Sequence, residues 1–333
     1  MNPAHYDYGD PDAEYRALTD GAGLVDRSSN SRIEHAGADA LDLLHRLTTN
    51  DLLDLVDGQA RGTIVTNGDA RIIDVLTVVR RPSRPLLLLG SEGRADAVLA
   101  WLDQYTFGED STPRDISGET VEFTLIGPRA EAVLRSAAGV PISLEPWRYS
   151  VAEFGGQHVE VVRTASPAVD GYEVIVTASG SSQVKGALAE AGAAPAGVRA
   201  FDAYRVAHCV PAYGRELDEH VNPHEANLLP FVSFTKGCYI GQEVVARLDT
   251  YDKVQRRLVR VVARSSVSSL ESGTLLMVDG QRVGELRTVA RAGPVTGHEA
   301  LAFVRRCFWE QGARSADRHG RELLVESTEA TAP

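Results

Sequence analysis

Apolar residues in the first third of the chain are grouped in short runs that turn residues separate. Residues 75–79 and residues 86–89 are each long enough for one strand. Pro82 and Pro85 lie between them and lack backbone donors, as expected in a turn. Residues 95–102 instead place apolar side chains on one face with helical spacing. The pattern predicts two paired strands followed by a helix.

Parts of this pattern occur twice in the chain. Residues 33–44 and residues 123–134 share an apolar residue, a glycine, an alanine and an apolar pair at the same spacing. The strand, turn and helix expected at residues 87–101 resemble those expected at residues 174–188. Two related α/β halves, each an antiparallel sheet with helices on one side, would explain the repeat. Coincidence among common residue types is the alternative.

After residue 251 the pattern of apolar residues in the sequence changes. Short strand-like runs follow one another without helical periodicity, at residues 258–262, 274–278, 282–286 and 300–304. Glycines lie between or inside these runs. Short strands at regular spacing predict a small all-β barrel or sandwich.

The predicted fold class is therefore α+β, with two related α/β halves followed by a small β-barrel. We place the first region at residues 1–250, with halves at about 1–115 and 116–250. The barrel covers residues 251–326. The polar tail at residues 327–333 is expected to be frayed.

Composition narrows the class of protein. The chain has 333 residues, of which 43% are hydrophobic and 24% charged, values typical of a globular protein. Its net charge of −12 disfavours non-specific binding to nucleic acid, which needs clustered positive charge. No apolar run reaches membrane-spanning length, and the first residues resemble neither a signal nor a transit peptide. Three widely spaced cysteines form no disulfide framework, so we expect a cytoplasmic protein.

The eight residues from Lys236 to Glu243, with the sequence KGCYIGQE, combine an amine, a thiol, a carboxylate and two glycines. Lys236 is one of only three lysines in the chain, and its ammonium would favour the thiolate form of Cys238. A tight turn around a buried, inert cysteine is the alternative. Cys209 and Cys307 lie among apolar neighbours and are expected to be buried and inert.

This octapeptide closely resembles the signature of the YgfZ-type folate-binding proteins, relatives of the glycine-cleavage T-protein (aminomethyltransferase). Softer similarities extend over nearly the whole chain. Residues 25–51 resemble the first helical segment of that superfamily, residues 125–130 the helix start of its second half, and residues 300–305 its C-terminal barrel. The resemblance implies two α/β halves, a β-barrel and a central tetrahydrofolate site.

The resemblance also implies which residues contact the folate. Glu173 matches the family's glutamate that binds the pterin, whose amino group and ring N–H can donate to a carboxylate. Arg205 matches the arginine that lies against the cofactor. We extend the set of folate contacts to Asp74 and to Tyr239 and Gln242 of the octapeptide.

One departure from the family is important for catalysis. T-proteins have two adjacent aspartates, the second of which holds the folate near its reactive nitrogen; in this chain the first is Asp74 and the second position is Val75. Neighbouring side chains on a strand point to opposite faces, so Asp74 cannot simply substitute unless a bulge shifts the register. Gly90 also takes the place of a family asparagine. Whether the chain is an enzyme is therefore open.

Two functions follow as hypotheses. The first is a tetrahydrofolate-binding accessory protein for iron–sulfur cluster assembly or repair, with Cys238 as the working thiol and Lys236 as its activator. Its partners would be iron–sulfur proteins or assembly factors, and a single thiolate could act only transiently, because a cluster generally needs four ligands. The alternative is a folate-dependent aminomethyltransferase or demethylase acting on a small amine. A folate-binding scaffold without chemistry of its own is a third option.

No metal site is predicted. His220 and His224 are four residues apart, but Pro223 breaks any helix that would place them on one face.

Overall fold

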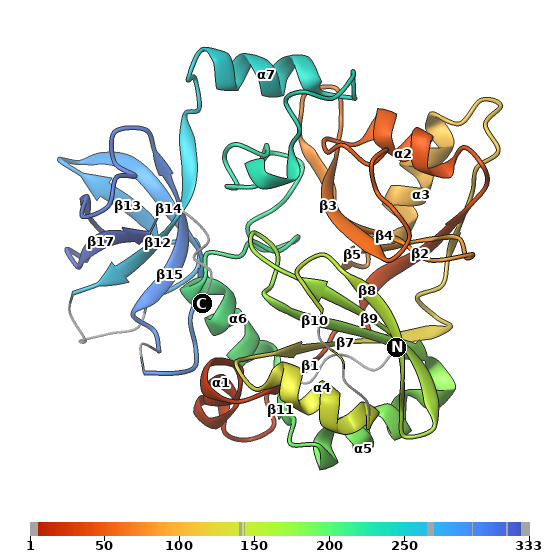
Figure 1. Ribbon diagram of the computed structural model, residues 1–333. Coiled ribbons are helices and arrows are strands. Elements are labelled where there is room, and N and C mark those ends of the chain that lie inside the picture. The colour runs from red at the N-terminus through yellow and green to blue at the C-terminus, as the bar shows by residue number, and fades with distance from the viewer. Residues whose placement is uncertain are drawn as a thin grey trace.

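The computed structural model describes residues 6–139, 142, 144–264, 270–294, 296–317 and 319–327 of the chain. Three β-structures surround the centre of the molecule (Figure 1). The first is a five-stranded antiparallel sheet in the order β3-β4-β5-β2-β6. Its strands are β2 (Asn30–Ala36), β3 (Gln59–Thr66), β4 (Ile72–Arg80), β5 (Leu86–Glu92) and β6 (Thr112–Asp115). Helices α2 (Ala40–Leu47) and α3 (Ala95–Gln104) share its hydrophobic core.

The second structure is a six-stranded sheet in the order β11-β1-β7-β10-β9-β8. Its strands are β1 (Gly23–Asp26), β7 (Thr120–Ile126), β8 (Tyr149–Phe154), β9 (Gln157–Thr164), β10 (Gly171–Thr177) and β11 (Ala194–Ala196). All pairs are antiparallel except β1 with β11. Helices α4 (Ala130–Ala138) and α5 (Ser181–Glu190), with the short 3-10 helix η1 (Ala178–Gly180) before α5, lie beside this sheet.

Strand β1 comes before the first sheet in the chain but belongs to the second sheet. Although β1 precedes β2 in the chain, it pairs with β7 and β11 of the second sheet. Helix α1 (Pro11–Asp20) packs beside it, against β11 and helix α6 (Val198–Ala207). Asp10 begins α1 by accepting a hydrogen bond from the backbone N–H of Ala13 at 2.9 Å. The resemblance predicted a helical segment from residue 25, but β1, a turn and β2 come before α2.

The sequence repeat corresponds to two equivalent turns. Gly37 follows β2 and Gly127 follows β7, with φ of +116° and +114°. A side chain at either position would be strained, because a Cβ atom would come within 2.0 Å of the carbonyl oxygen of Asp110 or 2.5 Å of that of Gly21. Each turn leads into the helix that covers its own sheet, so the two related α/β halves are confirmed.

The third structure is a closed barrel in the order β12-β15-β14-β13-β16-β17. Its strands are β12 (Arg256–Ala263), β13 (Leu275–Val278), β14 (Gln281–Val289), β15 (Glu299–Arg305), β16 (Arg314–Ala316) and β17 (Glu322–Ser327). The barrel has a hydrophobic core of its own. The four predicted strands are confirmed, whereas β16 and β17 were not predicted. Residues 328–333 of the tail predicted to be frayed lie outside the described residues.

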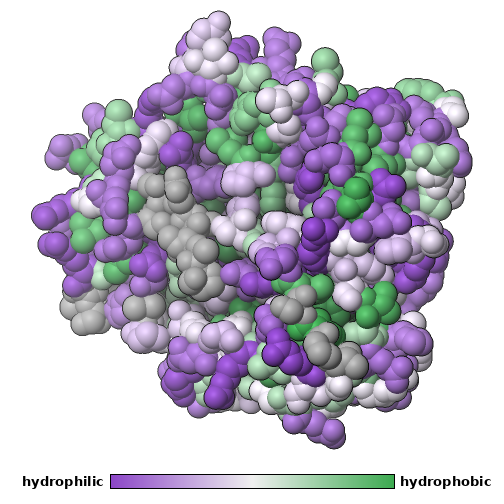
Figure 2. Space-filling model, viewed as in Figure 1, coloured by the Kyte–Doolittle hydropathy of each residue, from purple (hydrophilic) through white to green (hydrophobic). Residues whose placement is uncertain are grey.

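Helix α7 (Gln242–Thr250) leads from the first sheet towards the barrel (Figure 1). Val245 is its only fully buried side chain, and the Val245 carbonyl lies 2.9 Å from Nε2 of His224. On this face of the molecule, apolar residues gather between α7 and the centre (Figure 2). Within the described residues, every helix is too short or too polar to cross a membrane.

Arg32 links the two halves to each other through hydrogen bonds. Its side chain, on β2, is 0% exposed and donates to backbone or hydroxyl oxygens of Ser28, Asn30, Ser117 and Thr120 at 2.7 to 3.1 Å. Ser117 and Thr120 lie where the chain passes from β6 into β7. Arg32 Nη1 is also 3.5 Å from the carboxylate of Glu122 on β7. The guanidinium therefore holds β2 of the first sheet next to the start of β7 of the second sheet.

Candidate functional site

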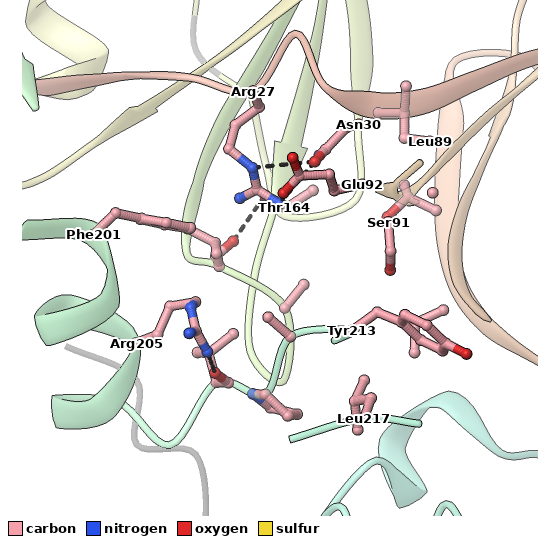
Figure 3. Close-up of a pocket in the computed structure, with 18 of the residues that line it drawn as sticks. Arg27, Asn30, Leu89, Ser91, Glu92, Thr164, Phe201, Arg205, Tyr213 and Leu217 are labelled. Atoms are coloured by element: carbon pink, nitrogen blue, oxygen red, sulfur yellow. Dashed lines mark hydrogen bonds between the residues drawn. The ribbon is translucent and has the colours of Figure 1, made fainter. Parts of the chain in front are cut away.

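A cavity of about 210 Å³ lies where the two sheets and α6 meet. Figure 3 shows Arg27, Asn30, Ser91, Glu92 and Thr164 on one side of it, with residues of α6 and of the following segment on the other. The labelled residues of that second side are Phe201, Arg205, Tyr213 and Leu217. Both α/β halves therefore contribute to one site.

Glu173 projects into this cavity from β10. It is 8% exposed, and its Oε2 accepts a hydrogen bond from the hydroxyl of Thr124 at 2.6 Å. Burial, with the nearby negative charge of Glu122 adding to it, raises the pKa of Glu173 to about 8. The glutamate that the resemblance assigns to the pterin is thus a buried carboxyl group whose protonated form is favoured.

Three further polar residues beside Glu173 were not predicted. Glu122 lines the cavity from β7, and its Oε1 accepts from the side-chain amide of Asn30 at 3.1 Å. Arg27 donates to Oδ1 of Asn30 at 3.3 Å and lies over the ring of Phe201 at 4.8 Å. Because Arg27 lies in the turn between β1 and β2 and Asn30 begins β2, the crossing of β1 brings them to the cavity. The sequence signal at Arg27 and Asn30 was only a soft family similarity, and Glu122 lies outside the similar segments.

Arg205 also lines the cavity, but its charge is already paired. Its guanidinium is 2.5 Å from Asp202 and 2.9 Å from Glu216, and it donates to the carbonyl of Val210 at 2.9 Å. Glu216 is fully buried. Arg205 therefore fixes the segment after α6 against that helix. A direct contact between Arg205 and a folate stays a prediction.

Asp74 and Val75 point to opposite sides of β4. Val75 lines the cavity, whereas Asp74 is 0% exposed behind the strand and accepts from the backbone N–H groups of Val75 and Ser91 at 2.9 and 3.1 Å. Burial raises the pKa of Asp74 to about 6. The ladder between β3 and β4 does shift its register next to Asp74. Even so, the shift leaves Val75 on the cavity wall.

The octapeptide lies outside the cavity lining. Lys236 Nζ donates to the backbone carbonyls of His45, Thr48 and Asn50, the last two at 2.7 and 2.9 Å. These carbonyls lie at the C-terminal end of α2 and just beyond it, where a helix leaves acceptors unpaired and favours a cation. The buried ammonium of Lys236 thus caps α2.

Other residues of the octapeptide fix its own loop on the turn between β3 and β4. Gly241 has a φ of +86°, and a Cβ there would lie 2.6 Å from the carbonyl of Asn67. Thr66 donates to the carbonyl of Ile240 at 2.6 Å, so the loop is fixed on the turn between β3 and β4. Burial raises the pKa of Tyr239 to about 12, and Lys236 lies 5.2 Å from its ring centre.

Cys238 is exposed, and Gln242 is half-buried at the start of α7. Neither belongs to the lining of the cavity, and neither does Tyr239. Their contact with a folate stays a prediction, and the structure places the thiol apart from the Glu173 cavity. Cys209 is buried as expected, but Cys307 is exposed in the loop after β15, so its predicted burial was wrong.

The chain was compared with known proteins. The GCVT N-terminal domain model matches residues 3–236. An aminomethyltransferase of Moorella thermoacetica is 30% identical over 311 residues, 88% of this chain and 85% of that protein. A chloroplastic protein of Arabidopsis thaliana is 29% identical over 301 residues, 90% of this chain and 69% of that protein.

The chain belongs to the glycine-cleavage T-protein superfamily. The solved aminomethyltransferase T of the Bartonella henselae glycine cleavage system shares its fold, with a TM-score of 0.84 over 95% of this chain and 88% of that one, at 22% identity. The predicted superfamily and fold class are therefore confirmed. The finer similarity to YgfZ-type proteins stays a prediction.

Within this T-protein fold, Lys236 should contribute measurably to stability. Replacing it with methionine leaves three carbonyls near the end of α2 without their donor, and we expect a loss of about 2 kcal/mol in unfolding free energy. Urea unfolding measures the loss. Lys253→Met is the control, because Lys253 is exposed beyond α7 and should change stability by less than about 0.5 kcal/mol. Equal effects of the two variants would contradict the capping role.

Proposed function

We propose that this member of the T-protein superfamily binds tetrahydrofolate in the central cavity and acts on a one-carbon unit carried by a small amine. The observation that carries the proposal is the buried carboxyl of Glu173, which faces a cavity built by both halves. The relatives named aminomethyltransferases support folate-dependent transfer as the class of reaction.

The polar groups of the cavity fit a pterin ring. Its amino group and adjacent ring N–H form a pair of donors that a glutamate carboxylate can accept side by side. The Glu122 carboxyl group lies on the same wall of the cavity, diagonally next to Glu173. Phe201 and the Arg27 guanidinium above it supply flat surfaces for the ring. In this proposal Glu173 holds the donor edge, and Glu122 lies beside it.

An adjoining hollow would take the rest of the folate. It has a volume of about 460 Å³ and shares Pro167 and Phe231 with the cavity. Phe231 ends the 3-10 helix η2 (Leu229–Phe231) and packs on Gly62, where a Cβ would come within 2.2 Å of the ring. Arg148 lies exposed at the hollow, so it could pair with the carboxylates of the glutamate tail.

The reacting end of the folate would meet an apolar wall. Val75 occupies the position at which the T-protein resemblance predicts a carboxylate, and Asp74 points away from the cavity. A transferase of this type therefore needs another group to position the one-carbon unit. Asp26 and Glu92 line the same cavity and are the carboxylates available to do so.

The transfer proposal is tested by offering the protein tetrahydrofolate with an aminomethyl-loaded carrier protein, whose aminomethyl carbon is already at the oxidation level of the product and leaves its nitrogen as ammonia. We expect formation of methylenetetrahydrofolate at a rate that depends on protein concentration. Folate binding without any transfer would overturn the transferase role and leave the second candidate.

That second candidate is a folate-binding accessory protein for iron–sulfur enzymes. The octapeptide and the missing carboxylate at Val75 favour it. Since Cys238 is exposed and lies outside the cavity lining, its sulfur would act on a partner protein rather than on the folate.

A Cys238→Ser variant tests this second role. Cys238 is exposed, so the variant should fold normally, yet it should fail to restore iron–sulfur enzyme activity in a strain that lacks the gene. Cys307→Ser, which removes another exposed thiol, is the matched control and should restore activity fully. Full rescue by both variants would exclude the thiol from the function.

A further inference from the structure

Two carboxyl groups share one face of the second sheet. Thr124 of β7 lies directly opposite Glu173 of β10, and Ile175 lies opposite Glu122. Side chains two residues apart on a strand point to the same face, so Glu122 is the diagonal neighbour of Glu173. Both side chains line the cavity, and Glu122 acts on Glu173 through its charge and through a side-chain hydrogen bond.

The pair has few donors to stabilise two negative charges. The hydroxyl of Thr124 serves Glu173, and the amide of Asn30 serves Glu122. Arg32 is 3.5 Å from Glu122, but most of its donors are bound to backbone carbonyls. The other charged groups around the cavity are Asp26, Arg27, Glu92, Asp202, Arg205 and Arg215. Arg27 acts on both carboxyl groups, whereas Asp202 and Arg205 are paired with each other.

Two adjacent buried carboxyl groups cannot both ionise easily, so one of them keeps a proton. Burial raises the pKa of Glu122, and burial together with Glu122 raises the pKa of Glu173 to about 8. Burial and the mutual repulsion of the two groups therefore favour a form of the ligand-free protein in which one proton stays between them. Such a proton occupies an acceptor position that a ligand donor would need.

We propose that Glu122 and Glu173 form a proton-sharing pair, and that the donor edge of a reduced pterin binds by displacing the shared proton into solvent. This inference rests on the proposed folate binding. Its chemistry balances without any oxidant or reductant, because the amino group and ring N–H of the ligand replace the proton as donors and the buffer accepts it. Glu122 is thus a positioning residue that acts through Glu173.

The pair makes binding depend on pH. The ligand binds the ionised form of Glu173, so the apparent affinity should rise with pH and level off above the pKa of about 8. Below that value, the affinity should rise by up to about tenfold per pH unit. Release of the proton should be detectable in the same range.

Titration calorimetry of the full chain with formyltetrahydrofolate, a stable reduced folate, tests the proposal. At about pH 6.5 the binding enthalpy should differ between two buffers of different ionisation enthalpy by an amount equal to about one released proton. At about pH 9 the difference should vanish. Equal enthalpies in both buffers, with an affinity that stays constant from about pH 6 to pH 9, would overturn it.

The Glu122→Gln variant tests whether Glu122 and Glu173 share a proton or whether Glu173 binds the ligand without any influence of Glu122. It leaves the Glu173 carboxylate for the ligand but removes the neighbouring charge, so the affinity should stay high and should level off at a lower pH than in the native chain, although burial still raises the pKa of Glu173. An unchanged pH profile in this variant would contradict the pair. Glu153→Gln, at an exposed position on β8 of the same sheet, should reproduce the native profile.

Infrared spectroscopy of the protein without ligand distinguishes failure of the pair from failure of the proposed function. A protonated carboxyl band should be present at about pH 7 in the native chain and absent from Glu173→Gln. If no reduced folate binds at any pH but the band is present, the proposed function fails and the pair stands. If folate binds and the band is missing, the pair is wrong and folate binding stands.

Discussion

Arg32→Met is expected to lower the free energy of unfolding by about 3–5 kcal/mol. The substitution removes the buried guanidinium that joins β2 to the residues leading into β7, and it leaves the carbonyls of Ser117 and Thr120 without donors. It also removes the positive charge next to Glu122. Urea unfolding of the native and variant chains measures the change.

Arg114→Met is the control for this prediction. Arg114 lies on the neighbouring strand β6 and forms ion pairs with Glu34 and Glu119, but half of its side chain is exposed. Exposed pairs contribute about 1 kcal/mol or less. A double variant that adds Glu122→Gln to Arg32→Met should recover part of the loss, because it removes the uncompensated acid. If Arg32→Met lowers the free energy of unfolding by no more than the control does, Arg32 does not stabilise the contact between the two sheets.

The second large effect is expected on ligand binding. Glu173→Gln should weaken the binding of a reduced folate by about 100-fold, which corresponds to about 2.8 kcal/mol. An amide replaces the carboxylate, so one of the two ligand donors meets another donor, and charge-assisted hydrogen bonds are lost. Calorimetry at about pH 8.5, where native Glu173 is mostly ionised, gives the largest contrast.

This loss should not reflect unfolding. Because the pKa of Glu173 is raised in the folded chain, the unfolded chain binds fewer protons between about pH 5 and pH 8. This group therefore makes the native chain less stable as the pH rises through that window. The glutamine variant has no such proton, so its stability relative to the native chain should increase over the same range. Binding equal to that of the native chain would show that Glu173 does not contact the ligand.

Local patterns in the sequence were sufficient for much of the fold. The runs at residues 75–79 and 86–89 are in β4 and β5, which pair with Thr77 opposite Leu89, and the periodic segment at 95–102 is in α3. These elements obey the simple rule that apolar side chains face one core. The repeated glycines were informative for the same reason, since each occupies a backbone conformation that other residues rarely adopt.

Features that depend on long-range pairing could not be predicted. Strand β16 has only three residues, and its ladder to β17 identifies it more than its own sequence does. The family similarity identified Glu173 as a site residue, but its partner Glu122 looks like any polar residue of a strand until the register of β7 and β10 is known. Lys236 was predicted to activate Cys238, and the carbonyls that bind its ammonium lie almost two hundred residues earlier in the chain.

The crossing of β1 has a consequence for synthesis on the ribosome. The strands from β2 to β6 can pair as soon as residue 115 has emerged, since all the neighbours of these strands in their sheet lie within this segment. Leu24 and Val25 of β1, however, have no partner strands until β7 and then β11, which ends at Ala196, have been made. The time that the ribosome takes to produce the second half therefore sets how long this apolar segment stays unpaired in the nascent chain.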